Sequence, residues 1–162
     1  MMRRRVVLAI TVLLALIAAG CWWHVTTDRT ADDPDRAVVM AAAAKATTAL
    51  MTRRAGEPPV RPEAAAGLTG RLADEYASQG ADVVLPGAVE QRLVMTARVV
   101  GTGTAEMGAG RARVLVFVDL WAAPPDAQRE VPRVALARWA SMRNVDGGWK
   151  LAGLTPVSGT LS

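Results

Sequence analysis

An uncharged run of 18 residues close to the start, VVLAITVLLALIAAGCWW at residues 6–23, constrains this chain most strongly. A helix of that length rises roughly 27 Å, close to the ~30 Å hydrocarbon core of a bilayer. Arginines favour the cytoplasmic end of such a helix, and tryptophan rings settle at the lipid–water boundary. The residues that flank the run in this way are Arg3, Arg4, Arg5, Trp22 and Trp23. The pattern predicts one membrane-spanning helix with its N-terminus in the cytoplasm.

The same residues allow two other fates for the start of the chain. The AAG sequence at residues 18–20 suits a signal-peptide cleavage site, and with Cys21 it forms a degenerate lipobox whose cysteine would carry a lipid. We expect the uncleaved helix. The predicted segments are a cytoplasmic stub at 1–5, a transmembrane anchor at 6–24 and a juxtamembrane linker at 25–33. All three alternatives place the rest of the chain outside the cytoplasm, in a single-pass protein of the cell membrane.

Charge and cysteine content exclude several classes of function. The first five residues hold three of the 19 basic residues, which leaves 16 basic against 15 acidic residues in the remainder. A nearly neutral domain offers little to a nucleic acid, which needs a basic face that neutralises several phosphates. Cys21 and His24 are the only cysteine and histidine, so neither an internal disulfide nor a Cys/His zinc cluster is expected. No acidic spacing resembles a calcium loop, and we expect neither a metal nor a cofactor.

Two helical segments follow the linker. Asp33 before Pro34 is typical of a helix start, and the helix is predicted to run to about Arg54. Its apolar face is mostly alanine, which favours close packing on a sheet: Val39, Ala43, Ala46 and Leu50. Residues 62–79 predict two shorter helices, because glycines at 67 and 70 weaken the middle. Tyr76 shares a face with two leucines and is predicted to fill the core.

Four strand-like runs come next, at residues 92–102, 111–122, 131–143 and 149–154. In the second run one face carries valines, and the other carries Leu115, Phe117 and Trp121, which predicts that this second face is also partly covered. Asp146-Gly147-Gly148 predicts a tight hairpin between the last two strands. Glycines in the segment 101–110, GTGTAEMGAG, lead into a strand rather than a helix, which favours a flexible hairpin loop over a phosphate-binding loop.

Helices followed by strands joined by short connections predict an α+β domain at 34–157, with a tail at 158–162. The order suits helices packed on a curved antiparallel sheet of about four strands, the cone-like arrangement of nuclear transport factor 2 (NTF2) and its relatives. Candidate functional residues are few, and none is catalytic. Asp119 has no second carboxylate as a partner, which favours a solvated strand residue over one at the cone mouth. The candidate interface or cone-mouth residues are Asp119, Trp121, Trp139 and Trp149, of which the last two are expected to pack across a hairpin or to anchor a partner.

Three segments together resemble the Mce-associated membrane proteins of actinobacteria, which accompany lipid importers. They are LTGRLADEY at 68–76, RARVLVFVDLWA at 111–122 and VDGGWKLAGLTPV at 145–157. The resemblance covers nearly the whole chain and implies an NTF2-like outer domain with an accessory role. It brings no catalytic residues, and Leu120 stands where the family more often has a polar residue.

The leading hypothesis is therefore a non-enzymatic accessory or scaffold subunit of an Mce-type lipid-transport system. Its expected partners are Mce-family transport proteins or their permease, together with membrane lipid, and homo-oligomerisation is left open. Two alternatives share the same architecture: a lipid-binding carrier with an apolar cavity, and a secretion-system scaffold. An enzyme would need a polar cluster in the cone mouth, and the sequence provides no signal for one.

Overall fold

The computed structural model describes residues 34–127 and 131–157. The predicted anchor, with its arginines and tryptophans, and the predicted tail lie outside these residues. Within the described ranges, no helix combines the length and the hydropathy needed to cross a membrane. The membrane anchor therefore stays a prediction from the sequence.

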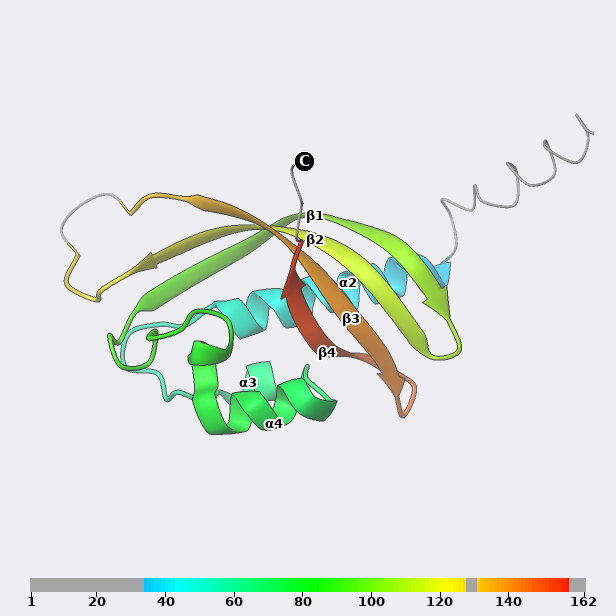
Figure 1. Ribbon diagram of the computed structural model, residues 1–162, viewed down its shortest axis with the longest axis horizontal. Helices are drawn as coiled ribbons and strands as arrows, with labels where there is room; N and C mark the ends of the chain where they lie inside the picture. Colours follow the sequence, from blue (N-terminus) through cyan, green and yellow to red (C-terminus); the bar gives the residue numbers. More distant parts are fainter. Residues whose placement is uncertain (1–33, 128–130, 158–162) are drawn as a thin grey trace, which may run out of the picture. The chain divides into compact units, whose positions relative to one another are not determined.

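The described residues form an α+β domain in which helices precede a sheet of four strands (Figure 1). The helices are α2 (Pro34–Met51), α3 (Pro62–Ala65), α4 (Gly70–Gln79) and the short 3₁₀ helix η1 (Gly80–Val83). The strands are β1 (Val94–Gly108), β2 (Arg111–Ala123), β3 (Val134–Val145) and β4 (Gly148–Pro156). Each strand pairs with the next in antiparallel fashion, in the order β1-β2-β3-β4. The α+β class and the four-stranded antiparallel sheet are as the sequence predicts.

One face of the sheet buries the core. In β2 the side chains of Val114, Val116 and Val118 are almost fully buried, while alternate residues point to the other face. The curved sheet arches over α2, α3 and α4, which all lie on the same side of it (Figure 1). The buried positions of α2 include the predicted stripe, Val39, Ala43, Ala46 and Leu50. Since alanine has no side chain beyond Cβ, this stripe lets the helix lie close to its neighbours.

The segment around α3 and α4 closes the core and covers part of an edge strand. Tyr76 is almost fully buried, and its hydroxyl oxygen accepts a hydrogen bond from the backbone N–H of Arg61 at 3.1 Å. Gly67 and Thr69 exchange backbone hydrogen bonds with Leu151 of β4, both at 2.9 Å. This short parallel bridge occupies backbone groups that an edge strand otherwise exposes. The two predicted short helices and the core position of Tyr76 are confirmed.

The glycine-rich segment 101–110 is not the loop that the sequence predicts. Strand β1 continues through it to Gly108, and only Ala109 and Gly110 make the turn, both with positive φ (48° and 70°). Two register shifts, between Val99 and Gly101 and between Thr104 and Glu106, absorb the irregularity. The prediction is wrong because pairing with β2 satisfies the backbone of these residues, and a local glycine count does not reveal that partner.

The predicted hairpin at residues 146–148 is confirmed as a tight two-residue turn. Asp146 and Gly147 have φ values of 52° and 81°, the left-handed pair that suits the twist of antiparallel strands. Strand β1 begins later and ends later than predicted, and β3 and β4 also extend past their predicted ends. The ends of each strand depend on where its hydrogen-bonded pairing with the neighbouring strand stops. The sequence pattern predicts that a strand exists more accurately than it predicts these ends.

The close packing of α2 can be tested with two equivalent substitutions on one helix. Ala43→Leu adds three carbon atoms where the helix is fully buried, so we expect a loss of about 1–3 kcal/mol in the free energy of unfolding. Ala41→Leu makes the same change on the exposed side, and we expect an effect within about 0.5 kcal/mol. Chemical denaturation followed by circular dichroism measures both. Equal effects would contradict this placement of the helix.

Candidate functional site

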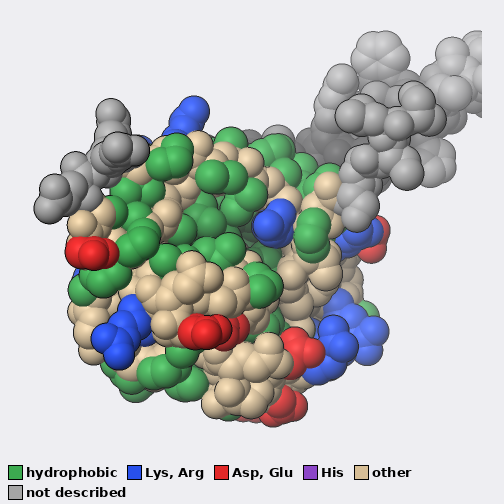
Figure 2. Space-filling view, turned by 60° about the vertical axis from the view of Figure 1, so that its left-hand side comes forward, with side chains coloured by type: hydrophobic (Ala, Val, Ile, Leu, Met, Phe, Trp, Pro, Cys, Tyr) green, Lys and Arg blue, Asp and Glu red, His purple; other side chains and the backbone are tan. Residues whose placement is uncertain are grey.

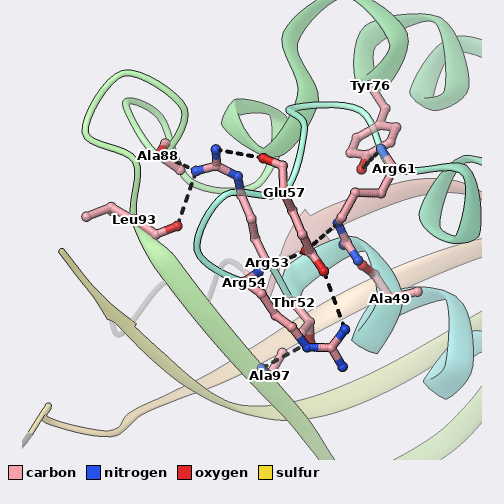
Figure 3. A network of polar contacts seen from close by, with 10 residues as sticks. All are labelled: Ala49, Thr52, Arg53, Arg54, Glu57, Arg61, Tyr76, Ala88, Leu93 and Ala97. Atoms are coloured by element: carbon pink, nitrogen blue, oxygen red, sulfur yellow. Dashed lines mark hydrogen bonds and ion pairs between the residues drawn. The ribbon is translucent and has the colours of Figure 1, made fainter. Parts of the chain in front are cut away.

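A buried arginine joins three separate segments of the chain. Arg53 follows α2 and is only 7% exposed. Its Nη1 donates to the carbonyl oxygens of Ala88 at 3.1 Å and Leu93 at 3.2 Å, and its Nη2 donates to that of Glu57 at 3.4 Å (Figure 3). Its backbone N–H and C=O also pair with those of Met95 at 2.8 Å. Arg53 therefore ties the end of α2 to the loop before β1 and to the start of that strand.

A second set of contacts orders the loop that follows. The Glu57 carboxylate accepts a hydrogen bond from the backbone N–H of Arg54 at 2.9 Å and lies 3.5 Å from Nε of Arg61. A guanidinium N–H of Arg61 donates to the carbonyl oxygen of Ala49 in α2 (Figure 3). The Arg54 backbone N–H is the largest cause that lowers the pKa of Glu57, and the neighbouring guanidinium charges lower it further. A carboxylate that stays ionised at neutral pH suits a structural role better than proton transfer.

A surface groove of about 690 Å³ lies beside this network, between α2, the loop after it and β1. Its apolar lining consists largely of small side chains, among them Ala44, Ala49 and Ala97. The charged residues around it are four basic ones and two acidic ones: Lys45, Arg54, Arg61, Arg98, Glu57 and Glu63. Arg61 and Glu57 already pair with each other, which leaves a mixed polar rim around a shallow apolar floor.

Three of the four candidate residues from the sequence share one face of the sheet. Asp119 and Trp121 alternate along β2 with the buried valines, and Trp139 pairs with Leu115, which also alternates with them. All three side chains therefore point away from the helices. We call this the open face; it carries Leu115, Phe117, Asp119, Trp121 and Trp139, and no described helix packs on it (Figure 1). Phe117 is 44% exposed, so the cover predicted for this face is missing at its centre.

Asp119 is neither solvated nor at the mouth of the curved sheet. Its side chain is only 12% exposed and accepts a hydrogen bond from Nη1 of Arg133 at 3.1 Å. Alternation along β2 places it on the open face, outside the curve of the sheet. Among the residues described, no group of three or more His, Cys, Asp or Glu side chains could hold a metal ion.

The expected tryptophan cluster across the last hairpin does not form. Trp139 pairs with Thr155, and Trp149 pairs with Asn144, so the two rings lie on opposite faces of the sheet. Trp149 packs against the hydrophobic core. Trp139 instead lies under the guanidinium of Arg113, whose Cζ is 4.2 Å from the ring centroid. The prediction is wrong because the register of β3 and β4 puts the two tryptophans on opposite faces of the sheet, although they lie on neighbouring strands joined by a tight hairpin.

No family model and no curated protein matches this sequence. Among solved structures, the domain is similar to CagV, a VirB8 homologue of the T4SS of Helicobacter pylori strain 26695. That likeness has a TM-score of 0.55 at 10% identity and covers 75% of this chain and 99% of the other. The intermembrane space region of the chloroplast protein ARC6 matches with a TM-score of 0.49 at 11% identity, over 78% of this chain and 98% of that one.

The likeness to CagV shows that the domain shares the fold of a VirB8 homologue, which agrees with the predicted NTF2-like arrangement. At such low identity it shows the fold alone.

The role of Arg53 can be tested against its exposed neighbour. Arg53→Met keeps the apolar stem but removes the donors to three carbonyl oxygens, so we expect a loss of about 2–3 kcal/mol in the free energy of unfolding. Arg54→Met removes a guanidinium whose side chain is 82% exposed, and its effect should stay within about 0.5 kcal/mol. Urea denaturation measures both. A loss for Arg53→Met no larger than that for Arg54→Met would refute the structural role.

Proposed function

We propose that this chain is a non-enzymatic scaffold subunit of a multi-protein assembly in the cell envelope. Its N-terminal segment holds it in the cell membrane, and its NTF2-like domain acts outside the cytoplasm through protein contacts. The observation that carries this proposal is the fold, which matches a VirB8 homologue over 99% of that chain. The exposed aromatic and arginine side chains of the open face support it, because such residues dominate protein–protein interfaces.

The kind of assembly is a finer proposal. A secretion-type scaffold is favoured, since the fold likeness to CagV supports it independently of the sequence. The Mce-type lipid-transport system rests on the resemblance of three sequence segments and is the second candidate. Its expected partners, Mce-family proteins or a permease, belong to that candidate alone.

A lipid carrier fits the structure less well. Carriers of this fold would hold lipid inside the curve of the sheet, in space left by apolar side chains. Here the inward-facing side chains of β2 pack against the helices and are almost fully buried, as at Val114, Val116 and Val118. The groove beside α2 opens at the surface and has a charged rim, which suits a polar partner better than an acyl chain.

Affinity purification of the tagged full-length chain from gently solubilised native membranes tests the proposal. Mass spectrometry should identify both the proteins and the lipids that accompany it. We expect other envelope proteins in reproducible stoichiometry, and their identity separates a secretion-type assembly from a lipid importer. A control protein that joins residues 1–33 to an unrelated outer domain shows which partners the outer domain recruits. Recovery of the chain alone with stoichiometric lipid would contradict a scaffold.

A further inference from the structure

The open face carries an apolar ridge that stands above its surroundings. Phe117 and Leu115 of β2 lie beside Trp139 of β3, since Leu115 pairs directly with Trp139. On the β1 side, their partners are Gly101 and Gly103, which have no side chains. The Phe117 ring lies over Gly101, where an added Cβ would be 3.4 Å from its Cδ2, and the space above Gly103 is open. The ridge is therefore accessible from the side as well as from above.

Basic residues surround this ridge. They are Arg98, Arg111, Arg113, Arg133, Arg143 and Lys150, placed on the open face by strand register or, for Arg133, by its contact with Asp119. Two acidic residues share the face: Asp119, paired with Arg133, and Glu106, 3.8 Å from Nη1 of Arg113. Six basic against two acidic residues give the open face a formal charge of +4.

The rest of the domain does not share this excess. Residues 34–93, which include all the helices, contain seven basic and seven acidic residues. Figure 2 shows hydrophobic side chains gathered over the upper part of the visible face, on the side of the sheet, and most of the acidic ones lower down, toward the helices. Residues 34–157 as a whole hold 15 basic and 12 acidic residues, so the positive excess of the domain lies on the sheet face and the helical layer is balanced.

The charge and the ridge together point to one kind of occupant. A second copy of this chain docked symmetrically would bring the same arginines against each other, and like charges at close range are repulsive. An anionic lipid surface could pair with the arginines, but it does not account for the stacking of the Arg113 guanidinium on the Trp139 ring within the ridge. Aromatic and arginine side chains side by side are the residues that anchor protein interfaces.

We propose that the open face binds an acidic, apolar-containing segment of another protein. Carboxylates of that segment pair with the arginines around the ridge, and its apolar side chains pack on Phe117 and into the space beside Gly103. This deepens the scaffold function and rests on it, because it names the surface and the chemistry of the partner.

Site-specific photo-crosslinking in the native membrane tests this assignment. A photoreactive phenylalanine analogue replaces Phe117 in the full-length chain, and a second chain carries it in place of Asp74, an exposed residue of α4. We expect the probe at Phe117 to capture a different protein through a segment with net negative charge. Arg113→Glu and Arg143→Glu together should lower the yield at least about tenfold, since both reverse charges on the open face, Arg113 on the Trp139 ring and Arg143 four residues further along β3.

The control for those reversals is Arg71→Glu, the same change at a side chain of α4 that is 88% exposed, which should leave the yield unchanged. A thermal melt of each variant ensures that only folded chains are compared. Adducts at Phe117 that contain only lipid, a second copy of the chain or a neutral or basic segment would overturn the inference. Protein adducts at Asp74 but none at Phe117 would overturn it and leave the scaffold function standing, whereas the absence of protein adducts at both sites would overturn both.

Discussion

Burial of a single face of β2 in the core shared with the helices is the constraint from which the rest of the domain follows. Val116 and its neighbours two residues away lie in one core with the alanine-rich face of α2, and each Å² of apolar surface removed from water there contributes about 25 cal/mol. Because side chains alternate along a strand, the same packing fixes Phe117 on the other face. A domain with one layer of helices and one sheet thus has a face left for contacts with other molecules.

Arg53 holds this two-layer arrangement together at its edge. It reaches carbonyl oxygens of Glu57, Ala88 and Leu93, so the loop before β1 and the loop after α2 share one donor group. Burying a guanidinium is costly unless it is hydrogen-bonded, and the three bonds made by Nη1 and Nη2 offset that cost, while Nε has no partner among the described residues. The charge of Arg53 is buried because its guanidinium bonds to backbone carbonyl oxygens. The arginines of the open face lie at the surface, where a partner can reach them.

Periodicity made the architecture predictable. The helical spacing around Ala43 and the alternation around Val116 repeat directly in the sequence, so the helix, the strand and their buried faces could be read from it. The extent of β1 could not be predicted, because its glycines are held in the strand by pairing with β2. The separation of Trp139 from Trp149 could not be predicted either, because it depends on strand register. The sequence shows which residues share a face but not what covers it. The contacts of Arg53 left no sequence signal, since its partners lie up to 40 residues away.

Thiol labelling at two adjacent residues of β2 tests most directly whether one face of the sheet is covered by helices and the other contacts a partner. Val116→Cys and Phe117→Cys are each introduced into the full-length chain, and the unsubstituted chain measures the background from Cys21. A maleimide is applied to native membranes and, in a second sample, to membranes solubilised in a detergent that dissociates complexes but leaves the domain folded. We predict that Cys at position 116 is protected in both, and that Cys at position 117 is protected in membranes and reactive after solubilisation. Reactivity at 116, or equal reactivity at 117 in both conditions, would contradict this account.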